Sequence, residues 1–191
     1  MGIEFELKYR ATPEIQEDLA RDGHWRSIAM ETTYYDTPSK AMSSRFFTLR
    51  RRKENGVSVC TLKTPASGSS RNEWELECDS IETAIPELCK LSGLALLAEL
   101  TAAGVKPVCG ARFTRHACRV APEGAEAEIA LDAGVLFGGG RELAFAEVEA
   151  ELKSGSEAAV VAWAQDLQRR FDLKPEPKSK FRRALDLAKG E

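Results

Sequence analysis

Charged and apolar residues alternate along several stretches of the chain, and the first of these is Glu4-Phe5-Glu6-Leu7-Lys8. The same pattern returns at residues 71–77 and 147–153. Because successive side chains of a β-strand point to opposite faces, each stretch predicts a strand with one charged face and one apolar face. Carboxylates spaced two residues apart repel each other, so they need water, cations or basic side chains opposite them.

The wider pattern predicts about eight strands, joined mostly by short connections and therefore mostly antiparallel, with helices at the start, middle and end. The predicted strands cover residues 3–9, 32–36, 46–53, 57–64, 71–78, 108–120, 125–131 and 147–153. The predicted helices cover residues 13–21, two pieces of 80–104 separated at Gly93, 157–171 and 180–188. The predicted turns include Asn55-Gly56, Asp132-Ala133-Gly134 and Gly138-Gly139-Gly140.

The charges separate by strand, with acids on the first, fifth, seventh and eighth predicted strands and bases on the third, fourth and sixth. On any one strand, such a face can be the wet side of a half-buried sheet. If the sheet instead closes with its apolar faces outward, beneath amphipathic helices, the charged faces line a lumen. The sequence thus predicts an α+β fold, an eight-stranded antiparallel β-barrel or tunnel with a charged lumen, surrounded by helices.

A lumen of this kind needs a ligand that satisfies both signs of charge. Carboxylates from different strands suit hard divalent cations such as Mg²⁺ or Mn²⁺, whereas Arg and Lys bind phosphate oxygens. A polyanion bridged by metal satisfies both sets together, and neither a neutral metabolite nor a bare anion does.

Composition narrows the class of protein. The length of 191 residues suits a single domain over residues 1–191, and the net charge of −3 argues against a broad basic surface for nucleic acid. No apolar run reaches the length of a membrane span, and five scattered cysteines indicate neither a disulfide framework nor a zinc site. We therefore expect a cytoplasmic protein without nucleic-acid or membrane partners. The leucine-rich segment 80–104 is either core or a homodimer interface.

The residues also resemble a known family, because Glu4-x-Glu6-x-Lys8 is the N-terminal signature of the CYTH domains, or triphosphate tunnel metalloenzymes. Further similarity follows in the family's order through Tyr35-Asp36-Thr37-Pro38, Leu49-Arg50-Arg51-Arg52, Thr61-Leu62-Lys63, Arg71-x-Glu73-x-Glu75, Phe113-x-Arg115, Ala130-Leu131-Asp132-x-Gly134, Glu147-x-Glu149-x-Glu151-Leu152-Lys153-Ser154-Gly155 and Ser179-Lys180. Together these matches cover nearly the whole chain.

The resemblance implies a tunnel that binds a triphosphate-containing small molecule and Mg²⁺ or Mn²⁺. Bacterial inorganic triphosphatases, which convert tripolyphosphate to pyrophosphate and phosphate, are the members that the chain is most similar to. A class IV adenylate cyclase and a thiamine triphosphatase are the alternative enzymes. A non-catalytic polyphosphate-binding module is an alternative of another class, although binding alone would favour a basic lumen over one rich in acids.

The resemblance also assigns roles to individual residues. The implied metal ligands are Glu4, Glu6, Glu149 and Glu151, with Glu75 and Glu147 as further contributors. The implied phosphate-binding residues are Lys8, Arg50, Arg52, Lys63, Arg71, Arg115 and Lys180. The implied catalytic residues are Lys8, Arg52, Glu149 and Lys180. Arg51 departs from the family pattern, and alternation predicts that it points away from the tunnel.

Overall fold

The computed structural model describes residues 2–21, 23–67 and 70–191. Its strands are β1 (Gly2–Glu4), β2 (Glu6–Arg10), β3 (Arg26–Asp36), β4 (Thr48–Glu54), β5 (Val57–Pro65), β6 (Arg71–Glu77), β7 (Lys106–Val120), β8 (Ala125–Gly138), β9 (Arg141–Gly155) and β10 (Lys174–Pro175). Its helices are α1 (Pro13–Ala20), the 3₁₀ turn η1 (Ser43–Arg45), α2 (Ile81–Ser92), α3 (Ala95–Thr101), α4 (Glu157–Arg170) and α5 (Lys180–Lys189). Among the helices of the described ranges, none is long and apolar enough to cross a membrane.

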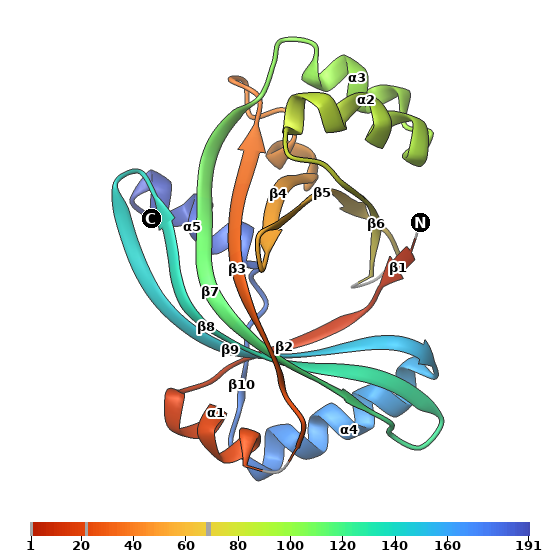
Figure 1. Ribbon diagram of the computed structural model, residues 1–191, viewed down its shortest axis with the longest axis vertical. Coiled ribbons are helices and arrows are strands. Elements are labelled where there is room, and N and C mark those ends of the chain that lie inside the picture. Colours follow the sequence, from red (N-terminus) through yellow and green to blue (C-terminus); the bar gives the residue numbers. More distant parts are fainter. Residues whose placement is uncertain (1, 22, 68–69) are drawn as a thin grey trace.

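One antiparallel sheet contains all the strands, in the order β1-β6-β5-β4-β3-β7-β8-β9-β2-β10. The first predicted strand is divided at Phe5: β1 pairs with β6, whereas β2 pairs with β9 at the far side of the sheet. The Phe5 carbonyl accepts a hydrogen bond from Leu152 N–H at 3.0 Å. The N-terminal segment thus joins the two sides of the curved sheet covalently, because β1 belongs to one side and β2 to the other. No continuous ladder of hydrogen bonds between described strands closes the sheet at this point. The strands curve around the centre of the molecule (Figure 1).

Two apolar clusters lie on the outside of this tunnel, as predicted. The pair α2 and α3 covers β5 and β6, where Leu62 and Trp74 pack against Ile81 and Leu88. Helices α1 and α4 lie together at the other end of the molecule, where Val148 belongs to the second cluster (Figure 1). Burying each such side chain contributes about 1.5–3 kcal/mol to folding.

A third apolar cluster lies on the tunnel side of the sheet, which the predicted arrangement of apolar faces did not include. Helix α5 packs on the tunnel side of β7 and β8, and its Phe181 ring lies 5.0 Å from the Tyr34 ring of β3. Met30 and Phe113 belong to the same cluster and also line the tunnel. The inner faces of β3 and β7 are therefore partly apolar because they receive a helix.

The predicted turn at Asp132-Ala133-Gly134 is also wrong, since these residues lie within β8. Gly134 is paired with Phe113 of β7, and a Cβ atom at Gly134 would lie 2.5 Å from the Phe113 Cα. A glycine inside a strand marks a close backbone approach here rather than a turn. The turn predicted at residues 138–140 is present between β8 and β9, where Gly139 and Gly140 have φ of 57° and 74°.

Candidate active site in the tunnel

The tunnel contains a cavity of about 1090 Å³, lined by side chains from β1 to β9 and from α5. Because the strands alternate, their inward positions carry nearly all of the residues that the sequence singles out. The predicted site residues that line the cavity are Glu4, Glu6, Lys8, Arg50, Arg52, Lys63, Arg71, Glu75, Arg115, Glu149, Glu151 and Lys180. Glu147 is the predicted ligand outside this lining, and its exposed fraction is 0%.

A buried acidic cluster lies where α5 meets β8 and β9. It consists of Asp132, Glu147 and Glu149, whose ligand atoms lie within 4.8 Å of one another. Lys180 Nζ lies 2.6 Å from Asp132 and 2.8 Å from Glu149, and it also contacts Glu147. Arg115 donates two hydrogen bonds to Asp132, at 2.8 and 2.7 Å, and a third to Glu149.

These ion pairs determine the protonation of the cluster. Burial disfavours the charged form of Glu149, but Lys180 and Arg115 outweigh burial and hold its pKa well below the usual range. The three carboxylates likewise raise the pKa of Lys180 despite burial. Burial raises the pKa of Glu147 although Lys180 and Arg183 oppose the shift. Lys180 and Glu149 are therefore both charged at neutral pH.

Lys180 reaches the cluster because a short segment leads α5 into the tunnel. β10 pairs with β2, and the Glu176 N–H then donates to the Lys8 carbonyl at 2.8 Å. The buried Glu176 carboxylate accepts from Arg10 Nε at 2.8 Å. Ser179 then caps α5 by accepting from the Arg182 N–H at 3.1 Å. Lys180 is thus the first residue of a helix anchored to the N-terminal strand.

A second group of paired charges lies across β1, β4, β5 and β6. Lys63 Nζ lies 2.5 Å from both carboxylate oxygens of Glu4. It also lies 3.3 Å from Glu73, which is 3.3 Å from Arg50. These strands supply alternating acids and bases that face the same cavity.

Several arginine nitrogens beside this group have no partner. The Nε atoms of Arg50, Arg52 and Arg71 are buried and make no hydrogen bond within the part of the chain that the structure describes. Burial lowers the pKa of Arg52, and the neighbouring Arg50 and Arg115 lower it further, although Glu54 opposes them. Unpaired buried arginine donors are suited to phosphate oxygens.

Glu6, in contrast, is an acid with too few basic partners. Its Oε1 atom lies 3.5 Å from Lys8 Nζ, its one ion pair among the described residues. Burial raises the pKa of Glu6, and the Glu149 carboxylate raises it further. A divalent cation would relieve this repulsion, and carboxylate oxygens are the ligands that Mg²⁺ and Mn²⁺ prefer. The residues present therefore fit a metal ion beside Glu6.

The remaining predicted ligands lie nearer the solvent. Glu151 pairs with Lys153 at 2.6 Å, and Glu75 is exposed on β6. Arg51 lies on the outer face, where its Nη1 donates to the Asp79 carbonyl at 2.9 Å, in line with its predicted direction.

The sequence did not assign roles to several charged residues that the structure brings to the site, and Asp132, Glu73 and Arg183 are among them. Asp132 stood in a predicted turn, although it belongs to a matched motif. Glu73 shares its face with Arg71 and Glu75, and this spacing could have revealed it. Arg183 contacts Glu147 from α5, and the sequence contains no signal for the depth at which a helix packs.

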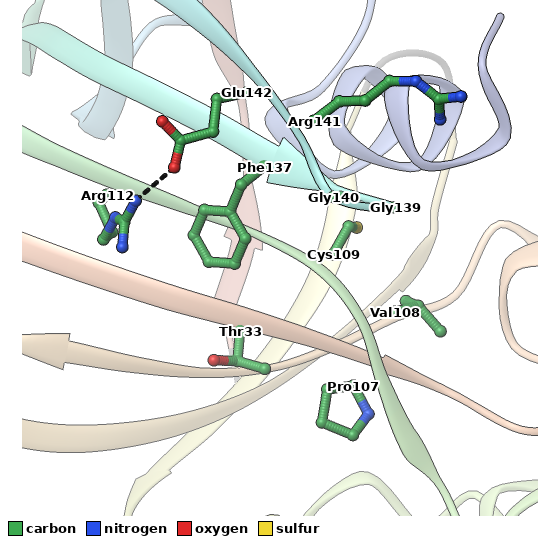
Figure 2. Close-up of a pocket in the computed structure, with 11 residues that line it drawn as sticks. Thr33, Pro107, Val108, Cys109, Arg112, Phe137, Gly139, Gly140, Arg141 and Glu142 are labelled. Carbon is green, nitrogen blue, oxygen red and sulfur yellow. Dashed lines mark hydrogen bonds and ion pairs between the residues drawn. The ribbon is translucent and has the colours of Figure 1, made fainter.

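A smaller hollow of about 500 Å³ lies beside β3, β7 and the turn between β8 and β9, and Figure 2 shows the residues that line it. Thr33 lines it, whereas the flanking Thr32 and Tyr34 line the tunnel. Its one ion pair in Figure 2 joins Arg112 to Glu142 at 2.6 Å. This hollow contains none of the predicted site residues.

The fold and the cavity together define a class: antiparallel β-tunnel proteins whose lumen holds buried acidic and basic side chains. The chain belongs to the CYTH domain family, whose model matches residues 2–185. It is 31% identical over 163 residues to an inorganic triphosphatase of Haemophilus influenzae, a match that covers 80% of this chain and 46% of that protein. The chain therefore spans about half the length of that relative.

Solved structures share the fold at lower identity. The PH1819 protein of Pyrococcus horikoshii matches with a TM-score of 0.67 and 24% identity, over 96% of this chain and 99% of that one. A Hippeastrum protein assigned as an adenylyl cyclase, and described as having a dominant triphosphatase activity, matches with a TM-score of 0.63 and 18% identity, over 100% of this chain and 97% of that one. These likenesses establish the architecture of the tunnel.

Proposed function

We propose that this protein is a divalent-metal-dependent hydrolase of triphosphates, with inorganic tripolyphosphate as its main substrate. The observation that carries the proposal is that one cavity contains both unsatisfied cations and an unsatisfied anion. Buried arginine Nε atoms lack hydrogen-bond acceptors within the described part of the chain, and the Glu6 carboxylate is repelled by Glu149. A triphosphate bound with a metal ion satisfies both. The curated relative, an inorganic triphosphatase, supports the same substrate.

In this proposal the metal is Mg²⁺ or Mn²⁺, and it neutralises phosphate oxygens when bound. Glu6 and Glu149 are the central ligands because their charges already repel each other in the cavity. Glu4 and Glu151 extend the set, and Glu75 is an outer contributor. Glu147 is the least accessible ligand, since it is fully buried and does not line the cavity.

The basic residues hold the phosphates and stabilise the charge that develops on the leaving pyrophosphate. Arg50, Arg52 and Arg71 have free buried donors for this role, and Lys63 is the base nearest to Glu4. The lysines Lys8 and Lys180, with Arg115, approach from the opposite wall. Catalysis of phosphoryl transfer depends mainly on positioning and electrostatic stabilisation, which such a fixed lumen provides.

The test is to incubate the purified protein with tripolyphosphate, thiamine triphosphate and ATP, in Mg²⁺ and in Mn²⁺, and to measure phosphate and cyclic AMP. The proposal predicts phosphate release from tripolyphosphate at the highest kcat/KM. Cyclic AMP formation would instead indicate a class IV adenylate cyclase. Preferential hydrolysis of thiamine triphosphate would indicate a thiamine triphosphatase. Binding without any product would indicate a polyphosphate-binding module.

We further propose that the partner is a small triphosphate in the cytoplasm rather than nucleic acid or a membrane, and that residues 1–191 act as one domain. The family match over residues 2–185 supports the single domain.

A further inference from the structure

Glu73 is an acidic residue of β6 to which the proposed function gives no role. It lines the tunnel cavity and is paired directly with Lys63 in the ladder between β5 and β6. Its Oε1 atom lies 3.3 Å from Lys63 Nζ and also 3.3 Å from Arg50 Nη2. One carboxylate oxygen therefore bridges two of the cations that we assign to the phosphates.

The bridging oxygen of Glu73 has the surroundings that suit a phosphate oxygen. Carboxylate and phosphate oxygens accept the same charge-assisted hydrogen bonds from arginine and lysine. The side chains of Glu73, Lys63 and Arg50 are at most 20% exposed, so salt and water screen their attraction little. Burial disfavours the charged form of Glu73, but Lys63 and Arg50 outweigh burial and lower its pKa. Glu73 is therefore an anion that occupies the donors of both cations.

Arg50 shows where a phosphate and Glu73 would meet. The Nη2 atom of Arg50 donates to Glu73, whereas its buried Nε makes no hydrogen bond to the described residues. Burial lowers the pKa of Arg50, but nearby anionic groups, Glu73 foremost, outweigh burial and raise it. Bidentate binding of a phosphate uses two neighbouring N–H groups of one guanidinium. A phosphate that takes the Nε and Nη2 donors of Arg50 together must therefore displace Glu73 from Nη2.

The backbone keeps Glu73 beside these two cations. Residue 73 is paired with Lys63 of β5 on one side and with Gly2 of β1 on the other, so its Cα position is fixed within the sheet. A carboxylate attached to a fixed backbone has a high effective concentration at its partners. Glu73 therefore competes with any phosphate at this position, and it cannot diffuse away once it is displaced.

We propose that Glu73 is an internal competitor of the substrate, which occupies Arg50 and Lys63 until a phosphate group displaces it. The inference rests on the proposed function, because it takes Arg50 and Lys63 as phosphate-binding residues. Each phosphate ligand held by these two residues must break the contacts of Glu73 and then lies beside its negative charge. Glu73 thereby lowers the affinity of the tunnel for its substrate, and removing its charge strengthens binding.

The test measures dissociation constants by calorimetry for a tripolyphosphate analogue whose bridging oxygens are replaced by methylene groups, so that it is not hydrolysed. Binding is measured in excess Mg²⁺ and in chelator. We expect Glu73→Gln to bind the analogue about tenfold more tightly than the wild type in both conditions, because charge-assisted hydrogen bonds no longer have to be broken. Glu77→Gln removes the same charge from the same face of β6, at an exposed position that does not line the cavity. This control should stay within about twofold of the wild type.

Unchanged or weaker binding by Glu73→Gln, or equal tightening by Glu77→Gln, would overturn the inference and leave the proposed function untouched. Weakening confined to Mg²⁺ would identify Glu73 as a metal ligand instead. Wild-type protein that binds the analogue but does not hydrolyse tripolyphosphate refutes the proposed function, and the variants still decide the role of Glu73.

A crystal structure of the wild type with the analogue decides the same question if Glu73→Gln fails to fold. We expect a phosphate oxygen to contact Arg50 and Lys63 in place of the Glu73 carboxylate. A Glu73 carboxylate that still bridges both cations, with the phosphates bound elsewhere, would overturn the inference.

Discussion

Neighbouring arginines on β4 show how alternation separates roles at the scale of single residues. Arg50 and Arg52 line the cavity, whereas Arg51 lies between them in sequence and binds the Asp79 carbonyl on the outer face. Three adjacent and chemically identical side chains therefore provide an internal control for the site.

Arg52→Ala should lower kcat/KM for tripolyphosphate about 100-fold, since removing one preorganised donor from a developing anion costs on the order of 3 kcal/mol. Arg51→Ala should stay within about twofold of the wild type. Steady-state phosphate release measures both variants. A loss of less than about threefold for Arg52→Ala would exclude the assigned role of Arg52.

Glu6→Gln should stabilise the metal-free protein at pH 7. The folded pKa of Glu6 is raised above its unfolded value, so the fold disfavours the charged form, and this penalty appears as the pH rises through the unfolded pKa of about 4.3. The gain in Tm should therefore shrink toward pH 4. Thermal unfolding in chelator measures it, with Glu123→Gln at an exposed position as the control.

Added Mg²⁺ or Mn²⁺ should raise the Tm of the wild type more than that of Glu6→Gln, because a ligand that binds the folded state stabilises it. An equal rise in Tm for Glu6→Gln and the wild type on addition of metal would show that Glu6 is not a metal ligand.

The directions of the site residues could be predicted from sequence, but their partners could not. Alternation alone places Glu4, Glu6 and Lys8 on one face. The contact of Lys180 with Asp132 and Glu149 depends on how deeply α5 enters the tunnel, and no local pattern encodes that depth.

At the scale of elements, β8 shows why a turn-like sequence can continue as a strand. Asp132-Ala133-Gly134 has the composition of a turn, but Asp132 is paired with Arg115 and Glu147 on the neighbouring strands. Pairing on both sides overrides the local preference for a turn. Local propensity is therefore least informative where a strand lies between two others.

Gly134→Ala should destabilise the protein by about 2–3 kcal/mol, because the added methyl group would force the adjacent β7 backbone to move. Urea unfolding measures the loss. Ala133→Ser, on an exposed neighbouring position, should change stability little. A tolerated alanine at position 134 would contradict the close packing of β7 and β8.

Arg183→Ala should destabilise the protein by about 3 kcal/mol, because it removes one of the two cations that contact the buried Glu147. The exposed Arg182 pairs with Asp186, so Arg182→Ala should cost less than about 1 kcal/mol. Urea unfolding of both variants measures the difference. Equal losses would show that the pair with Glu147 contributes nothing specific.

At the scale of the whole molecule, the alternating charges predicted the tunnel but not how it closes. The charged face of each strand follows from the period of two, and the antiparallel order follows from the short connections. Among the described residues, the sheet has ten strands rather than the predicted eight, because the first strand is divided and β10 is added. The division of the first strand at Phe5, which lets β1 and β2 pair with opposite sides of the sheet, depends on the curvature of the complete sheet. The inner position of α5 is a global property for the same reason.

We have proposed that the tunnel hydrolyses a triphosphate with the help of a divalent metal. The most direct measurement is the amount of phosphate and pyrophosphate formed from tripolyphosphate by the wild-type protein, with Mg²⁺ or Mn²⁺ and then with excess chelator. We predict one phosphate and one pyrophosphate per tripolyphosphate in the presence of metal, and loss of turnover in chelator. Absence of turnover with either metal, or equal turnover in chelator, would refute metal-dependent triphosphate hydrolysis by this protein.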